Sequence, residues 1–187
     1  LPVRSRATRR QVTRFVAPPE GAELDALRVR ADPVQHALIA AHVTLVRDED
    51  VADWEVVLER LARLLPRPIE LELGPPEELA GGGLTLPARG PCAAYEALRA
   101  QLLAGQPGAA RAPRPHVTLL HPRNRARWGL TPADVRASRL PTRVTLAAPI
   151  LIEQEPGQTW LCVRSSQRDP DPQASADAAA QGRRSTE

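Results

Sequence analysis

His42-Val43-Thr44-Leu45 and His116-Val117-Thr118-Leu119 are one four-residue motif that occurs twice, once in each half of the chain. Both copies lie in apolar segments, residues 37–46 and 116–121, which we predict to be strands. Residues two apart in a strand point to the same face, so each copy presents an imidazole beside a hydroxyl. A single strand histidine is usually structural, but the duplication favours one active site in which both copies face a shared cleft.

Such a cleft suits phosphodiester chemistry. One histidine can take a proton from water while the other gives a proton to the departing ribose oxygen, because the pKa of histidine lies near neutrality. The hydroxyls of Thr44 and Thr118 can donate hydrogen bonds to the non-bridging phosphate oxygens. We therefore predict that His42 and His116 are catalytic and that both threonines bind phosphate. We expect no metal and no cofactor, since the histidines and cysteines lack metal-binding spacing.

The rest of the sequence predicts alternating strands and helices. A helix is expected to start at Thr131, because a threonine N-cap is followed there by Pro132 at the first helical position. Further strands are predicted at residues 11–17, 68–73, 84–87, 142–148, 150–155 and 158–164, and further helices at residues 20–30, 51–65 and 92–104. The order suggests two similar units. We therefore expect an α+β fold with two pseudo-symmetric antiparallel-sheet lobes, outer helices and a central cleft.

The motifs, HVTL at residues 42–45 and PHVTL at residues 115–119, resemble those of the 2H phosphoesterase superfamily. The similarity is to its bacterial branch of 2′-5′ RNA ligase-like proteins and RNA 2′,3′-cyclic phosphodiesterases, and it covers residues 11–165. The resemblance implies a bilobal α+β fold that hydrolyses the 2′,3′-cyclic phosphate ends of RNA or nucleotides to 2′-phosphates. It also implies that His42 and His116 form the acid/base pair, in which we assign His116 as the base and His42 as the acid.

Two other functions are open at this point. The same acid/base pair runs in either direction, so reversible 2′-5′ joining of RNA is an alternative within the enzyme class. A nucleotide- or RNA-binding module that uses the cleft without turnover is an alternative outside it. In each case the partner is RNA or a nucleotide.

Four residues outside the motifs are ambiguous. Relatives often carry a basic residue soon after their second motif, and Arg123 is our candidate for a further phosphate clamp. His121 lies five residues after His116, an odd spacing, and we predict that it points away from the cleft unless a bulge intervenes. Arg47 suits a surface ion pair and phosphate binding equally. Trp128 could stack a nucleobase, but covering the core beside the Thr131 helix is the favoured interpretation.

The chain of 187 residues suits a single bilobal domain, which we place at residues 11–166. Five arginines and no acidic residue precede residue 15, and we predict a flexible basic arm at residues 1–10. Small and polar residues dominate from residue 167 onward, which predicts a disordered tail at residues 167–187. No segment has the length of apolar sequence that a membrane span needs, and we expect a cytoplasmic monomer.

Overall fold

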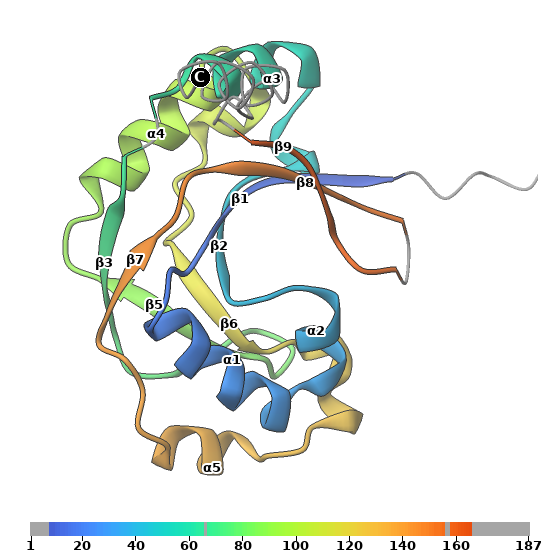
Figure 1. Cartoon of the computed structure of the whole chain (residues 1–187), viewed down its shortest axis with the longest axis vertical. Coiled ribbons are helices and arrows are strands. Elements are labelled where there is room, and N and C mark those ends of the chain that lie inside the picture. Colours follow the sequence, from blue (N-terminus) through green and yellow to red (C-terminus); the bar gives the residue numbers. More distant parts are fainter. Residues whose placement is uncertain (1–7, 66, 156–157, 166–187) are drawn as a thin grey trace, which may run out of the picture.

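The structure, a computed structural model, describes residues 8–65, 67–155 and 158–165. It contains two antiparallel sheets with helices at both ends of the molecule, as Figure 1 shows. This confirms the predicted α+β fold with two antiparallel-sheet lobes. Residues 1–7 of the predicted arm and the predicted tail from residue 167 lie outside the described residues, whereas Arg9 and Arg10 belong to the first strand.

The first sheet combines strands from the two ends of the chain. Its order is β2-β1-β8-β9, and every neighbouring pair is antiparallel. The strands are β1 (Arg9–Phe15), β2 (His42–Arg47), β8 (Ile150–Gln154) and β9 (Leu161–Ser165). The first motif therefore lies on an edge strand of this sheet, next to the strand that opens the chain.

The second sheet is built from the middle of the chain. Its order is β4-β5-β3-β7, and β6 also pairs with β5. The strands are β3 (Ile69–Leu73), β4 (Glu77–Glu78), β5 (Leu84–Arg89), β6 (His116–Leu120) and β7 (Arg143–Leu146). A bridge between Val16 and Leu146 joins the ends of β1 and β7, so the two sheets are held to each other by backbone pairing.

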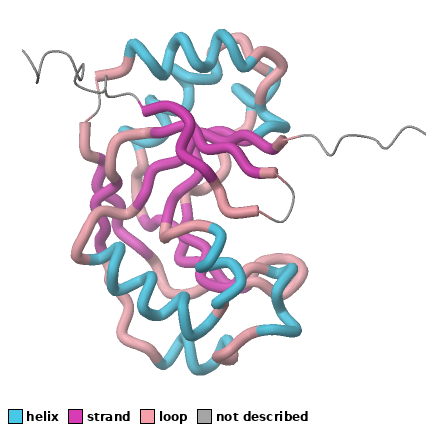
Figure 2. Tube along the Cα trace, turned by 45° about the vertical axis from the view of Figure 1, so that its right-hand side comes forward, coloured by secondary structure: helices cyan, strands magenta, loops and turns pink. Residues whose placement is uncertain are grey.

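Two helices pack against the sheet of the other lobe. The helix after β1, α1 (Glu20–Ala31), packs against β6 and β7 of the second sheet, and α4 (Ala93–Leu103) packs against β2 of the first. Figure 2 shows these helices at opposite ends with the strands between them. The remaining helices are α2 (Pro33–Leu38), α3 (Trp54–Arg63) and α5 (Pro132–Ala137), with short 3₁₀ turns η1 (Asp48–Asp50), η2 (Pro107–Ala110) and η3 (Pro122–Arg127).

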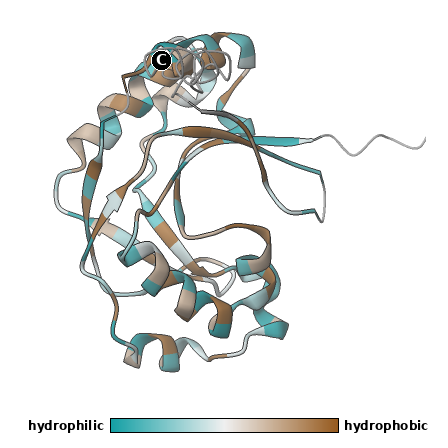
Figure 3. Ribbon diagram, in the orientation of Figure 1, coloured by the Kyte–Doolittle hydropathy of each residue, from teal (hydrophilic) through white to brown (hydrophobic). Residues whose placement is uncertain are grey.

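A continuous apolar core lies between the sheets and helices. It includes Val43 and Leu45 of the first motif and Val117 and Leu119 of the second, all fully buried. Figure 3 shows a hydrophobic stretch at the start of β8, the strand whose Leu151 belongs to this core. The motif strands are thus fixed by their own apolar residues, while their polar residues stay on the opposite face.

The predicted strand over residues 37–46 is partly wrong. Residues 33–38 form α2, and the strand begins only at His42. Asp32 caps this helix by accepting a hydrogen bond from the Gln35 backbone N–H at 3.0 Å, and Pro33 occupies the first helical turn. The aspartate cap and the following proline therefore override the apolar run that suggested a strand.

The other predicted elements are confirmed, with ends that differ by up to three residues. The predicted cap of α5 is present as a reciprocal pair, because Thr131 accepts from the Asp134 backbone N–H and the Asp134 carboxylate accepts from the Thr131 backbone N–H. Within the described ranges, none of the helices is long and apolar enough to cross a membrane.

Candidate active site

A polar cavity of about 240 Å³ contains both motifs. Its walls come from the first sheet, from α2, from η1, from β6 and from the segment that follows β6. The lining residues are Arg9, Arg10, Gln11, Gln35, His42, Thr44, Arg47, Asp48, Glu49, His116, Thr118, His121, Arg123 and Trp160. The five residues predicted for the site, His42, Thr44, His116, Thr118 and Arg123, therefore line one cavity.

The same strand geometry presents both histidine–threonine pairs. In β2 and in β6 the histidine and threonine are partly exposed, and the residues after each of them are buried. Thr44 pairs with Thr13 of β1, and Thr118 pairs with Thr85 of β5, so each motif is held from one side by a neighbouring strand. The two pairs approach the cavity from different sheets.

Each motif strand contains a bulge directly after its threonine. Val12 and Thr13 are adjacent in β1, but their partners in β2 are Val46 and Thr44, so Leu45 is an extra residue. Leu119 is the extra residue of β6 in the same way, because Leu84 and Thr85 pair with Leu120 and Thr118. A bulge shifts the alternation of side chains by one position.

The bulges bring the fifth residue after each histidine back to the cavity. That residue is Arg47 in β2 and His121 after β6, and both line the cavity. The sequence predicts that His121 points away from the cleft unless a bulge intervenes. The structure contains that bulge, and His121 lines the cavity. Arg47, which the sequence leaves undecided, also lies in the site, although it additionally approaches Glu49 at 3.7 Å.

Both catalytic candidates are oriented by the same backbone contact. Nδ1 of His42 lies 2.8 Å from the carbonyl oxygen of Ala40, and Nδ1 of His116 lies 3.0 Å from that of Arg114. A carbonyl oxygen only accepts, so Nδ1 must carry the proton in both rings. Nε2 is then the nitrogen that gains or loses a proton in each ring, which is the arrangement that acid/base catalysis needs.

The environment of His42 favours its neutral form. Burial lowers the pKa of His42 from 6.5 to about 4, and the positive charges of Arg28 and His116 add to this effect, while the Ala40 carbonyl opposes it. The ring of Phe15 meets the imidazole edge-on, with the ring centres 6.3 Å apart. Near neutral pH, His42 is therefore an unprotonated imidazole in the free protein.

Beyond each bulge, a buried aspartate accepts a hydrogen bond from the backbone of the residue that returns to the cavity. Asp50 accepts from the Arg47 backbone N–H at 3.1 Å, and Asp32 accepts from the His121 backbone N–H at 2.8 Å. These carboxylates are only 3% and 1% exposed. Asp50 also forms an ion pair with the buried Arg99 at 3.1 Å. The two aspartates thus fix where the strand backbone leaves the site.

Arg123 contacts His121, the residue that follows β6. Nδ1 of His121 accepts from the Arg123 backbone N–H at 3.2 Å and from its Nε at 3.3 Å. Burial, followed by the positive charge of Arg123, lowers the pKa of His121. Nε2 of His121 lies 3.4 Å from a terminal nitrogen of the same guanidinium, so Arg123 contacts both ring nitrogens of His121.

The favoured interpretation of Trp128 is confirmed, and a different tryptophan lies in the site. Trp128 packs against the apolar core just before α5. Trp160, Gln11, Asp32 and Asp50 were not identified from the sequence. Trp160 and Gln11 lie outside any motif, and only the strand pairing brings them to the cavity; Asp32 carried a local signal, the helix cap before Pro33.

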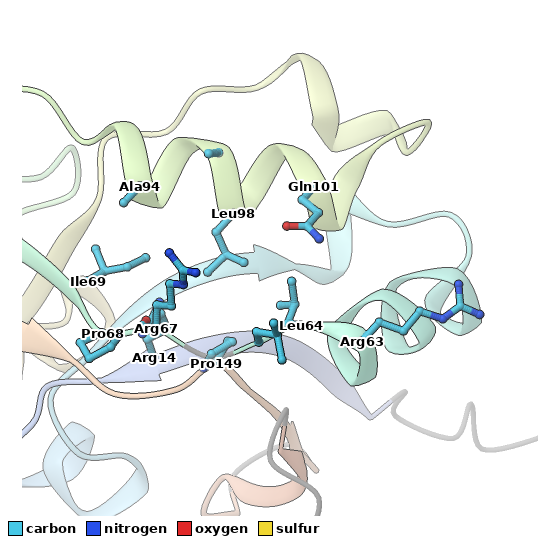
Figure 4. A pocket seen from close by; sticks show the side chains of 12 residues that line it. Arg14, Arg63, Leu64, Arg67, Pro68, Ile69, Ala94, Leu98, Gln101 and Pro149 are labelled. Carbon is cyan, nitrogen blue, oxygen red and sulfur yellow. The ribbon is translucent and has the colours of Figure 1, made fainter.

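A larger groove of about 510 Å³ lies away from the histidines, between α3 and α4 (Figure 4). Its most buried polar side chain is Arg14, whose guanidinium donates to the carbonyl oxygens of Arg67, Leu146 and Ala147. Desolvation lowers the pKa of Arg14 to about 10. These bonds tie β1 to the segment where the chain passes from β7 to β8, a structural role. Within the described part of the chain, no three histidine, cysteine or acidic residues are grouped as metal ligands.

Comparisons with known proteins agree with this architecture. Three structures of E. coli LigT have similar folds: its phosphate complex (TM-score 0.51, 18% identity, 85% of this chain and 97% of that one), its 3′-AMP complex (0.52, 16%, 86% and 99%) and its NADP+ complex (0.52, 17%, 88% and 100%). No curated protein matches the sequence. The family model of the 2′-5′ RNA ligase superfamily matches residues 16–158. The resemblance seen in the motifs is thereby confirmed, and the chain belongs to the 2′-5′ RNA ligase superfamily of 2H phosphoesterases.

Proposed function

We propose that this protein hydrolyses the 2′,3′-cyclic phosphate ends of RNA or nucleotides to 2′-phosphates. The observation that carries this proposal is the pair of histidines, His42 and His116, which line one cavity and donate through Nδ1 to a backbone carbonyl. The family supports an enzyme of the phosphoesterase type. The specific reaction is inferred from what two imidazole Nε2 atoms can do to a strained cyclic diester.

The reaction needs one proton acceptor and one proton donor. Water attacks the phosphorus while one Nε2 takes its proton, and the bond between phosphorus and the ribose 3′ oxygen breaks. The other histidine gives its Nε2 proton to that oxygen, which leaves a 3′ hydroxyl and a 2′-phosphate. The first imidazole then releases its proton to solvent and the second regains one from solvent, so atoms and charges balance without a covalent intermediate.

The lowered pKa of His42 supports the roles that we propose. An imidazole with a pKa of about 4 is unprotonated near neutral pH and can accept the proton of the attacking water. His116 is then the acid. This reverses the assignment made from the sequence, where nothing distinguished the two motifs.

The phosphate is held from both lobes in this scheme. The hydroxyls of Thr44 and Thr118 donate to the non-bridging oxygens, where negative charge grows in the transition state. Arg123 and Arg47 supply positive charge at the same cavity, because both line it. These four residues would bind the product phosphate as well as the cyclic substrate.

The test is hydrolysis in the presence of a chelator, with adenosine 2′,3′-cyclic phosphate and with an oligoribonucleotide that ends in a cyclic phosphate. Product analysis should give a 2′-phosphate. His42→Ala and His116→Ala should each lower turnover by about 10²- to 10⁴-fold, while His36→Ala, at a histidine outside the cavity, should retain it. Retained turnover in both motif variants would exclude the proposed mechanism.

The same assay separates the two alternatives. Joining of a 2′,3′-cyclic phosphate end to a 5′ hydroxyl end would show the reverse, ligase direction. Binding of a nucleotide with no turnover of either substrate would favour the binding module instead.

A further inference from the structure

One amide inside the cavity has no hydrogen-bond partner. Gln11 is 8% exposed, and its Nε2 group is buried without a partner among the residues that the structure describes. Leaving a buried N–H unpaired is costly, so such groups are uncommon in folded proteins. Because Gln11 also lines the cavity, a bound molecule is the natural source of the missing acceptor.

An aromatic face lies close to this amide. Trp160 is half-buried, lines the same cavity, and is anchored by its backbone N–H, which donates to the Leu38 carbonyl at the end of α2 at 3.1 Å. The guanidinium of Arg9 lies over its ring, 5.6 Å from the ring centre. Arg9 is exposed, so the ring face that it covers is one that a flat group arriving from solvent can take.

The strand geometry brings the amide and the indole together. Arg9 and Gln11 are two residues apart in β1 and therefore point to the same face, so the group that contacts Trp160 is the immediate neighbour of Gln11. On its other side Gln11 pairs with Arg47 of β2, which reaches the phosphate end of the cavity. The order along the cavity wall is thus Arg47, Gln11, then Trp160.

We propose that Gln11 and Trp160 form a nucleobase subsite next to the phosphate site. The indole stacks on the base, and the Gln11 amide hydrogen-bonds the edge of the base, since an amide offers both a donor and an acceptor to it. The inference rests on the proposed function, because it assigns the base of the nucleotide whose cyclic phosphate lies between the histidines. It predicts that the protein recognises a nucleotide rather than any cyclic phosphate.

The experiment measures binding of two ligands by isothermal titration calorimetry, so that the base contribution separates from the phosphate contribution. The ligands are adenosine 2′-phosphate and inorganic phosphate. Trp160→Leu should weaken binding of the nucleotide by about 5- to 150-fold, the range for losing one stacked base. Gln11→Leu should weaken it by about 2- to 12-fold. Binding of inorganic phosphate should not change in either variant.

Two controls guard against damage to the fold. Trp160→Phe keeps a stacking surface and should retain most of the affinity for the nucleotide. Gln101→Leu removes the same side chain from the groove between α3 and α4 and should leave both affinities unchanged. Unchanged nucleotide affinity in both subsite variants would overturn the proposal, and so would an equal loss for the two ligands.

Turnover assays distinguish a failure of this inference from a failure of the proposed function on which it rests. If cyclic ribose phosphate without a base is hydrolysed as efficiently as adenosine 2′,3′-cyclic phosphate, the subsite is wrong and the phosphodiesterase stands. If no cyclic phosphate is hydrolysed but nucleotide affinity still depends on Trp160, the subsite stands and the phosphodiesterase is wrong.

Discussion

The two motif strands, β2 and β6, have the same backbone features and differ in the residue that lies beyond the bulge. In β2 and β6 alike, a histidine donates through Nδ1 to a carbonyl two residues earlier, and a bulge comes directly after the threonine. Beyond the bulge the first strand carries an arginine and the second a histidine. The duplicated part holds the groups proposed to move protons, whereas the divergent part places a guanidinium on one side of the cavity and an imidazole on the other.

The supports of the two strands differ in origin as well. Asp50 binds the backbone of Arg47 from only three residues away, within the same 3₁₀ turn. Asp32 binds the backbone of His121 from a distant part of the chain, the cap of α2. One motif is therefore fixed locally, and the other depends on a contact between segments far apart in sequence. Substitutions in the two strands and in their supports test how far the equivalence extends.

The largest effect is expected from the histidines themselves. His42→Ala or His116→Ala should each lower kcat by about 10²- to 10⁴-fold, the usual loss for a positioned acid or base. Because the two groups act in one step, the double variant should be little worse than the more damaged single variant. Steady-state kinetics on adenosine 2′,3′-cyclic phosphate measure this, and losses that multiply would mean that the histidines act independently.

Asp50→Ala should cause the largest loss of folding stability. It leaves the guanidinium of Arg99 buried without its counter-ion, which costs about 3–5 kcal/mol. Urea unfolding followed by circular dichroism measures the change in the free energy of unfolding. A loss below about 1 kcal/mol would show that the carbonyl oxygens around Arg99 are sufficient to stabilise its charge.

The threonines should contribute equally if the lobes hold the phosphate symmetrically. Thr44→Val and Thr118→Val each remove one hydroxyl donor and should lower kcat by about 10²- to 10³-fold. Valine keeps the shape of the side chain, so the fold should be retained. A strong effect at only one of the two positions would show that the growing charge faces a single lobe.

Asp32→Ala should cost less stability than Asp50→Ala, about 1–3 kcal/mol, since it removes an acceptor of backbone N–H groups without stranding a buried arginine. The Asp32→Ala variant should also shift the position of His121, which a change in the proton resonances of that ring would report. Kinetics identical to those of the unaltered protein would show that the second strand does not need its distant support.

His42 should make the folding stability depend on pH. Its pKa in the folded protein is about 4, against 6.5 in the unfolded chain. Between these values the unfolded chain binds a proton that the folded chain does not, so this ring lowers stability as pH falls from 6.5 towards 4. Above pH 6.5 the ring is unprotonated in both the folded and the unfolded chain, so this loss of stability is absent. Proton NMR of the four histidines, assigned with single variants, measures the pKa, and a value of 6.5 would contradict the lowered pKa.

The motifs and most elements could be predicted from the sequence because their signals are local. The alternation in residues 69–73 and the cap at Thr131 are examples, and both are present as expected. The bulges could not be predicted, since Leu45 and Leu119 become extra residues only relative to their partner strands. Gln11 likewise joins the site through pairing with β2. The helix at residues 33–38 has a local signal in its aspartate cap and proline, but the apolar run that it enters is equally typical of a strand.

The pairing of strands from the two ends of the chain in one sheet affects how the protein is made. Synthesis proceeds from the N-terminus, so β1 and β2 leave the ribosome well before β8, which must pair with β1. The second sheet, by contrast, has all of its strands once Leu146 has emerged. A nascent chain halted there should hold His116 in a sheet whose strands are all present and His42 beside an uncovered strand edge. The sheets that hold the two halves of the active site should therefore be completed at different times, and the sheet that holds the first-translated motif is completed last.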